Sequence, residues 1–258
     1  MYLRVTIPLC GRAVDDIIAR LADFEIDGIE EQADAVAAYF QDRETAQAVA
    51  DEFAADSPEE MEDRNWSAEL QDAWQPIAVG ARFFLCPPWM DVVTPPGRIH
   101  LAMIPGNVFG GGDHPTTQLC LELLETLIQP GQTSAQTSAQ TIADIGAGTG
   151  ILTRAARALG ARAYGCDIDP ASAPLVDILG SADSMATTRF DGIIANIHLA
   201  VHRQLRPEFL RLARPGAWLL ASGFLPEQAP EMEALFGPAQ VLNEKGGWCA
   251  ALFVLAPI

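Results

Sequence analysis

A glycine-rich turn and an acidic residue carry the clearest chemistry in the sequence. Residues 144–150 read Asp-Ile-Gly-Ala-Gly-Thr-Gly, between a strand pattern that begins at Thr141 and an amphipathic helix pattern over 151–159. Glycines at a strand-to-helix turn let the backbone bend sharply and approach a ligand with no side chain in the way. Asp167 ends the next strand pattern, where an acidic side chain can hydrogen-bond a ribose hydroxyl. The two features together predict a nucleotide pocket.

The spacing of the glycines narrows the choice of nucleotide. A dinucleotide-binding turn has Gly-x-Gly-x-x-Gly, whereas Gly146, Gly148 and Gly150 are each two residues apart, and Asp144 precedes them. This variant resembles the first motif of the Rossmann-like methyltransferases, whose cofactor is S-adenosylmethionine. Backbone amides of the turn suit the carboxylate of that cofactor, and Asp144 suits its ammonium. An NAD-dependent oxidoreductase is disfavoured by the same spacing.

Composition limits the partners. With 34 acidic and 16 basic residues the formal net charge is −18, which disfavours a DNA or RNA substrate and favours a basic protein partner, although solubility alone is an equal explanation. The five cysteines are scattered without a CxxC pair, so neither a disulfide framework nor a metal site is expected. No apolar run is long enough to span a membrane and the N-terminus is no signal peptide, so we expect a cytoplasmic protein.

The chain divides into three stretches by pattern. Residues 1–55 read as strand, helix, strand, strand, helix, which is typical of a small ferredoxin-like α+β domain. Residues 56–80 are interpreted as a linker that starts with the solvated acidic stretch 56–63. From residue 81 to 258, strand and helix patterns alternate toward the end as a doubly wound parallel sheet requires. The predicted fold is therefore an α/β Rossmann-like domain preceded by a ferredoxin-like domain.

Further landmarks carry a family resemblance over nearly the whole chain. They are Phe109-Gly-Gly-Gly-Asp-His-Pro-Thr-Thr117, Phe190-Asp-Gly-Ile-Ile-Ala-Asn196, Gly247-Trp-Cys249 and the linker motifs Asn65-Trp66, Trp74-Gln-Pro76 and Pro87-Pro-Trp89. With the glycine turn and Asp167, they resemble the ribosomal protein L-11 methyltransferase family. The resemblance implies an N-terminal domain that holds the ribosomal protein and a catalytic domain after the linker. It also implies that Thr117, Gly146, Asp167 and Asn196 contact S-adenosylmethionine, to which we add Gly148 of the turn.

The resemblance implies an S-adenosylmethionine-dependent protein methyltransferase that modifies amino groups of ribosomal protein L-11, on lysine side chains, at the N-terminus, or on both. Two alternatives stay open: the same reaction on lysines of another protein, and a degenerate family member that binds a partner without catalysis. No catalytic base is evident. Asn196 offers a neutral carbonyl that could orient an amine, and His114 is interpreted as a residue that fixes its loop. We expect a monomer that does not bind nucleic acid directly.

The sequence departs from the family in two places. Gly111 and Asp113 stand where the family commonly has threonines, and only 22 residues separate Asp169 from the strand pattern at Gly192. A helix, a strand and a loop normally occupy that interval. One interpretation, which we favour, makes 175–179 a strand and shrinks the preceding helix to 169–174; the other makes 174–180 a short helix and loses the strand. Either way, the adenine side of the pocket is expected to be thinly covered.

Overall fold

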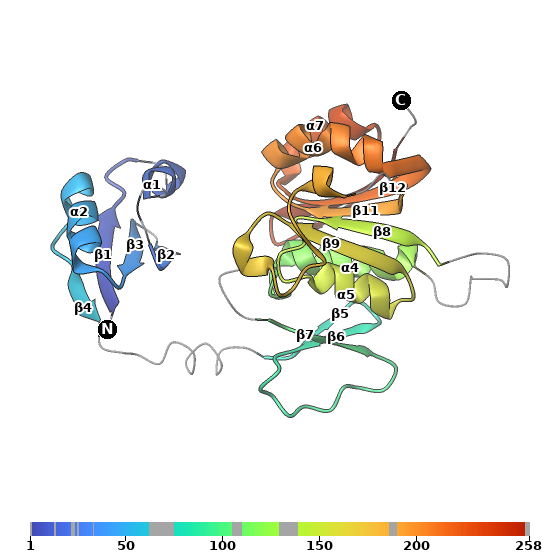
Figure 1. Cartoon of the computed structure of the whole chain (residues 1–258), viewed down its shortest axis with the longest axis horizontal. Helices are drawn as coiled ribbons and strands as arrows, with labels where there is room; N and C mark the ends of the chain where they lie inside the picture. Colours follow the sequence, from blue (N-terminus) through green and yellow to red (C-terminus); the bar gives the residue numbers. More distant parts are fainter. Residues whose placement is uncertain are drawn as a thin grey trace. The chain divides into compact units, whose positions relative to one another are not determined.

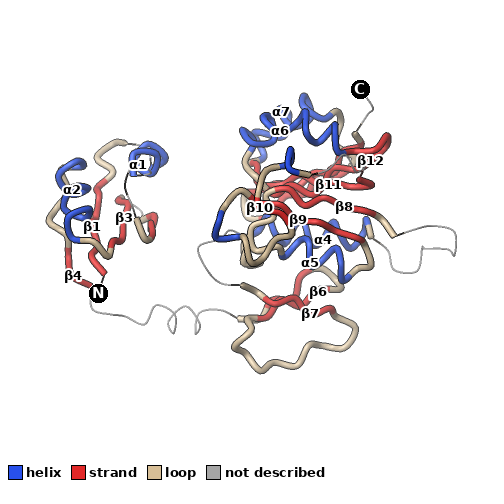
Figure 2. Tube along the Cα trace, viewed as in Figure 1, coloured by secondary structure: helices blue, strands red, loops and turns tan. Residues whose placement is uncertain are grey.

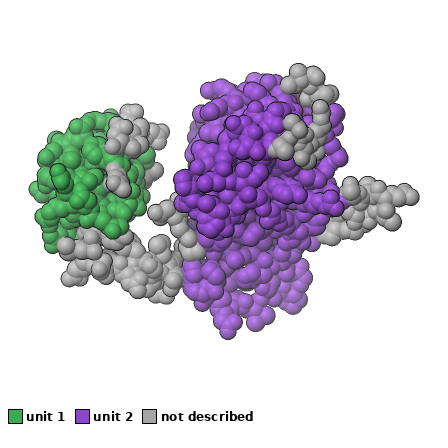
Figure 3. Space-filling model, viewed as in Figure 1, with its two compact units in different colours: residues 1–73 green, residues 74–258 purple. Residues whose placement is uncertain are grey.

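The computed structural model describes residues 2–12, 14–21, 24, 26–32, 34–61, 75–104, 110–128, 139–185 and 190–255. The chain forms two compact units, residues 1–73 and 74–258, which Figure 3 colours separately. The landmarks Asn65, Trp66, Trp74 and Phe109 lie outside the described residues. Within these ranges, every helix is too short or too polar to cross a bilayer.

The first unit has the ferredoxin-like order of elements. They are β1 (Tyr2–Pro8), α1 (Val14–Leu21), β2 (Gly28–Glu31), β3 (Ala35–Phe40), α2 (Arg43–Phe53) and β4 (Glu59–Met61). The strands pair in the order β2-β3-β1-β4, and every pair is antiparallel. Alternate residues of β1 pack against one face of each helix, and Val5, Ile17 and Val49 are among the fully buried residues of that core. The period-two strands and helical spacing of the sequence thus produce one layer of helices on one sheet.

Strand β4 corrects the sequence interpretation, which placed a solvated connection at 56–63. Glu59 and Glu60 lie opposite Arg4 and Leu3 of β1. The Arg4 guanidinium donates to Glu59 at 2.6 Å, and Glu60 forms an ion pair with Arg43. Charged residues are common on edge strands because they discourage pairing with other chains. Strand β4 was not predicted because its exposed glutamates pair with arginines, so its sequence shows no alternation of apolar and polar residues.

A three-stranded sheet opens the second unit. It contains β5 (Ile77–Val79), β6 (Phe83–Cys86) and β7 (Ile99–Ala102), in that order. Strand β5 falls inside the predicted linker 56–80, so that linker boundary is wrong for the last residues. The Glu125 carboxylate accepts hydrogen bonds from the backbone amides of Ala81 (2.9 Å) and Arg82 (2.7 Å). These contacts attach the small sheet to the helix that carries Glu125, α4 (Pro115–Leu127).

A seven-stranded sheet forms the body of the second unit. Its elements are β8 (Thr141–Ile145), α5 (Ile151–Ala158), β9 (Arg162–Asp167), β10 (Ile178–Leu179), β11 (Phe190–Asn196), α6 (Leu199–Leu212), β12 (Ala213–Phe224), α7 (Ala229–Phe236), β13 (Val241–Lys245) and β14 (Trp248–Val254). The strand order is β10-β9-β8-β11-β12-β14-β13; the pairs from β10 to β12 are parallel, and β14 runs antiparallel to both β12 and β13. Helices α4 and α5 cover one face and α6 and α7 the other (Figure 1).

The order of the strands places a ligand crevice. From β8 the chain proceeds outward through β9 to β10, then returns to the other side of β8 as β11. In open α/β sheets, ligands bind outside the carboxyl ends of the strands at the point where this order reverses. The glycine turn that follows β8 and the residues that end β9 and β11 therefore meet at one edge.

The connection between β9 and β10 is shorter than a helical crossover. Ten residues, 168–177, contain a single 3₁₀ turn over Pro170–Ser172, and β10 follows with two residues that pair with Cys166 and Asp167. Figure 2 shows β10 as a short segment beside β9. Of the two sequence interpretations, the one that keeps a strand is correct in kind, but the strand comprises only Ile178–Leu179 and not 175–179; the helix over 174–180 is wrong.

Candidate active site

The glycine turn needs glycine at all three positions for its backbone conformation, and at two of them also for lack of space. Gly146, Gly148 and Gly150 have φ of +71°, +53° and +69°, which side chains disfavour. A Cβ on Gly146 would lie 2.6 Å from Cγ2 of Ile197, and one on Gly150 would lie 2.7 Å from the carbonyl oxygen of Leu175. The turn therefore packs tightly between the end of β11 and the connection that follows β9.

Asp167 fastens this turn from the neighbouring strand. Its Oδ2 accepts a hydrogen bond from the backbone amide of Gly148 at 2.7 Å, and its Oδ1 accepts one from the amide of Asp169 at 2.9 Å. The amides of Gly146 and Ala147 donate to the carbonyl of Cys166, at 2.9 and 3.0 Å. A carboxylate has about four acceptor sites, so Asp167 can hold the turn and still accept from a ligand hydroxyl.

Two predicted site residues bury polar atoms that have no partner within the described chain. Thr117 is fully buried in the first turn of α4, and its Oγ1 makes no hydrogen bond. Asn196 is 9% exposed at the end of β11, and its Oδ1 is also without a partner. Because buried polar groups are nearly always hydrogen-bonded in native proteins, these two atoms, among several such buried atoms in the described chain, are candidates for a hydrogen bond to a bound group.

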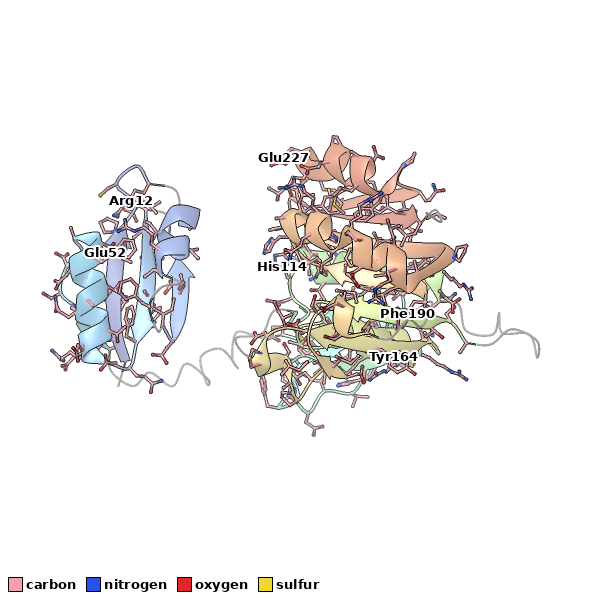
Figure 4. The ribbon with its side chains drawn as sticks, turned by 45° about the horizontal axis from the view of Figure 1, so that its top comes forward. Arg12, Glu52, His114, Tyr164, Phe190 and Glu227 are labelled. Carbon is pink, nitrogen blue, oxygen red and sulfur yellow. The ribbon has the colours of Figure 1, made fainter. Side chains whose placement is uncertain are left out.

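The structure brings the predicted residues together unequally. Gly146, Gly148 and Asp167 share one hydrogen-bonded unit, and Asn196 adjoins it through Ile197. In the part of the chain that the structure describes, the Thr117 side chain makes no hydrogen bond to that unit. In Figure 4, His114 lies at the opposite end of the large sheet from Phe190, where β11 begins, so the start of α4 lies near the carboxyl ends of the strands.

Asp144 lies beneath the turn as a buried charge. It is 1% exposed, its Oδ2 accepts a hydrogen bond from the Thr153 hydroxyl at 2.6 Å, and its Oδ1 has no partner among the described residues. Burial raises the pKa of Asp144 to about 6, although the bond from Thr153 works in the opposite direction. A buried carboxylate with a free oxygen suits a cationic group of a ligand.

Comparison with known proteins identifies the family of this chain. The profile described as "Ribosomal protein L11 methyltransferase (PrmA)" matches residues 16–254. The chain belongs to this family. The ribosomal protein L11 methyltransferase of Aeromonas salmonicida is 35% identical over 211 residues, which cover 74% of this chain and 68% of that protein. That of Synechococcus elongatus is 36% identical over 214 residues, covering 73% and 69%.

A solved structure shows the same fold. The ribosomal protein L11 methylase from Lactobacillus delbrueckii subsp. bulgaricus superposes with a TM-score of 0.59 at 24% identity, covering 72% of this chain and all of that one. The family resemblance read from the sequence and the Rossmann-like fold class are therefore confirmed. As a member of the ribosomal protein L11 methyltransferase family, the chain is a methyltransferase.

Thr149 and Arg154 also support the site, although neither was predicted from the sequence. The Thr149 hydroxyl donates to the carbonyl of Gly110 at 2.5 Å, which joins the glycine turn to the loop before α4. The Arg154 guanidinium donates to the carbonyls of Thr149 (2.6 Å) and Ala102 (3.0 Å). Arg154 follows Gly150 by one helical turn, a spacing that could have indicated a contact with the turn.

His114 caps the helix that carries Thr117. Its backbone is extended at the position before Pro115, and its Nδ1 accepts from the amide of Thr116 at 3.3 Å and lies 2.7 Å from the Thr116 hydroxyl. The ring also meets Trp248 edge to face, at 5.2 Å between centroids. Burial lowers the pKa of His114 despite the nearby Asp113. This supports the interpretation of His114 as a loop-fixing residue.

Asparagine in place of His114 should therefore preserve methyltransferase activity. Asparagine is a preferred N-cap and can still accept from the amide of Thr116, whereas His114→Ala should cost about 1 kcal/mol of stability. Activity across pH and urea unfolding of both variants would check this. A loss of about 100-fold in His114→Asn, together with a changed pH profile, would instead indicate proton transfer by His114.

The buried carboxylate of Asp144 should make the free energy of unfolding decrease as the pH rises. Because its pKa is raised to about 6 in the folded state, folding binds a proton between the unfolded pKa and that value. The destabilisation of the folded state by the ionised Asp144 is therefore absent below the pKa of the unfolded chain, and it is complete above about pH 6. We expect Asp144→Asn to be more stable than wild type by about 1–3 kcal/mol at pH 8, and by less at pH 5.

Urea unfolding at both pH values measures this difference. Thr153→Val is the matched variant with the opposite sign, because it removes the hydrogen bond that stabilises the Asp144 carboxylate. Its loss of stability should be larger at pH 8 than at pH 5. An Asp144→Asn effect that is the same at both pH values would contradict the buried charge.

Proposed function

We propose that this methyltransferase uses S-adenosylmethionine to methylate amino groups of ribosomal protein L11, on lysine side chains, at the N-terminus, or on both. The observation that carries the proposal is Asn196, whose buried Oδ1 has no partner within the described chain at the end of β11. A carbonyl oxygen in this place can accept an N–H from an amine and orient the nitrogen lone pair. The relatives named above, which are ribosomal protein L11 methyltransferases, support the choice of substrate.

The site residues fit the proposed cofactor. When bound, S-adenosylmethionine would supply a methyl group on a sulfonium sulfur, which leaves as a neutral thioether when an amine nitrogen takes up the methyl. We assign its carboxylate to the amides of the glycine turn, its ammonium to Asp144 and its ribose hydroxyls to Asp167. The unpartnered Oδ1 of Asp144 and Oγ1 of Thr117 are buried polar atoms that a bound group would satisfy.

The chain's own contribution to the reaction is mainly positioning. Holding two reacting groups in near-attack geometry can supply a large part of a barrier reduction. A lysine amine, with an ordinary pKa of about 10.4, must lose its proton before it attacks. Two described histidines near the site are poorly placed for that step: His114 Nδ1 caps α4, and buried His202, whose pKa burial lowers to about 4, bonds the Ser222 carbonyl at 2.9 Å. Asn196 therefore orients the amine.

The substrate side rests on charge and on the first unit. The net charge of −18 favours a basic protein partner. We assign substrate recognition to the ferredoxin-like unit, extended beyond the predicted boundary at 55 to include β4 (Glu59–Met61). We further propose that the enzyme acts in the cytoplasm as a monomer and has no direct nucleic-acid partner.

Calorimetric titration with S-adenosylmethionine, followed by transfer of a labelled methyl group to purified ribosomal protein L11, tests the proposal. Binding and label transfer would support it. Binding without transfer to L11 would point to another protein substrate. No binding at millimolar S-adenosylmethionine would favour a degenerate member of the family, an alternative that the short connection after β9 motivates.

A further inference from the structure

The connection between β9 and β10 lacks a helix of its own. Parallel strands are usually joined by a dozen residues or more that include a helix, whereas residues 168–177 contain one 3₁₀ turn. The connection leads into β10, which pairs with Cys166 and Asp167, and the amide of Gly180 just after β10 donates to the carbonyl of Asp167 at 2.7 Å. Whatever holds the connection therefore also holds the backbone beside Asp167.

Arg157 of α5 and Asp177 supply that attachment. Nη2 of Arg157 lies 2.8 and 2.7 Å from the two carboxylate oxygens of Asp177, and it also donates to the carbonyl of Ala163 at 2.7 Å. Asp177 Oδ2 accepts from the amide of Gly165 at 2.8 Å, and the Asp177 amide donates to the Gly165 carbonyl at 3.0 Å. The side chain and the backbone amide of Asp177 are thus both hydrogen-bonded to Gly165, which lies two residues before Asp167.

The other end of α5 touches the same connection. The Leu175 carbonyl packs so closely on Gly150, the N-cap of α5, that a Cβ there would lie 2.7 Å from it. Thr153 and Arg157 are four residues apart and share a face of α5. Thr153 bonds Asp144 of β8, while Arg157 reaches β9 and the residue before β10. Helix α5 therefore joins three strands and replaces the missing helix.

We propose that Arg157 and Asp177 are positioning residues for the nucleoside end of the cofactor, an inference that rests on the proposed function. They hold residues 168–177 against α5, so that Asp167 and β10 form a fixed wall of the pocket. Their side chains are 44% and 34% exposed, and an isolated exposed ion pair contributes little to stability. Their contribution lies in the network with Ala163 and Gly165, which acts on the pocket more than on the fold.

Cofactor affinity and turnover of the full chain separate this role from a structural one. Arg157→Met and Asp177→Ala should each raise the Kd for S-adenosylmethionine about tenfold, with kcat at saturating cofactor and KM for L11 within about twofold. The double variant should bind about as well as Asp177→Ala, because the two residues act through one contact. Asp177→Asn, which still accepts from Gly165, should recover most of the affinity; if Asp177→Ala fails to fold, the tenfold rise in Kd of Arg157→Met carries the test.

Arg203→Met is the matched control. It breaks the exposed Arg203–Glu231 ion pair between α6 and α7, which cover the face of the sheet opposite to α5. Unchanged affinity in Arg157→Met, additive losses in the double variant, or an equal loss in Arg203→Met would each overturn the positioning role. Wild type that fails to bind S-adenosylmethionine would overturn the proposed function itself, so the two failures are distinguishable.

Discussion

Alanine in place of Asn196 is expected to lower kcat for methyl transfer by about 100-fold, the size of loss that follows when a reacting group is misplaced by about 1 Å. The side chain ends β11, which is held between β8 and β12, and the amide of Ile197 donates to the Ser222 carbonyl at 3.1 Å. This rigid support fixes an oxygen that has no partner within the described chain. Removing it leaves an incoming amine free to rotate.

Single-turnover methylation of ribosomal protein L11 at saturating S-adenosylmethionine measures this effect. Asn196→Asp tests the same role through the pH dependence of the rate. A carboxylate at this position would stabilise the protonated amine and shift that dependence to higher pH. Asn243→Ala, on strand β13, is a control for loss of an asparagine elsewhere in the same unit. A single-turnover rate of Asn196→Ala within about threefold of wild type would contradict the orienting role.

The elements around the site were predictable because their patterns are local. Helix α5 begins at Ile151, directly after the last glycine of the turn, and the pattern over 151–159 matches its apolar face. The site residues could be grouped for a topological reason: Gly146, Asp167 and Asn196 end or follow parallel strands, and the carboxyl ends of such strands share one edge. Alternation of strands and helices was therefore enough to bring them together.

What the sequence left open depends on contacts between distant residues. Strand β4 consists largely of glutamates whose partners, Arg4 and Arg43, lie far away in the chain. The pair of Arg157 and Asp177 spans 20 residues and includes two backbone groups that no side-chain pattern reveals. The hydrogen bond between Asp167 and the amide of Gly148 was not predictable either, because it depends on the left-handed backbone of the turn.

That bond makes Asp167→Ala the largest expected change in cofactor binding. The substitution leaves the amides of Gly148 and Asp169 without their acceptor and removes the proposed ribose contact. The affinity loss comes from the ribose contact: a hydrogen bond to a charged group contributes about 1.5–3 kcal/mol, and each 1.4 kcal/mol is tenfold in affinity. We expect the Kd for S-adenosylmethionine to rise by about 30-fold or more on this basis.

Calorimetry on Asp167→Ala and two companions locates the cause. Asp167→Asn keeps one acceptor oxygen but cannot serve both amides, so its affinity should fall between wild type and Asp167→Ala. Asp169→Ala removes a nearby exposed carboxylate that caps the 3₁₀ turn through Ala171, and it should change the Kd by less than about threefold. If Asp167→Ala binds as well as wild type, the nucleoside end of the pocket lies elsewhere. A loss in Asp169→Ala as large as that in Asp167→Ala would show that the connection, and not the Asp167 carboxylate, controls affinity.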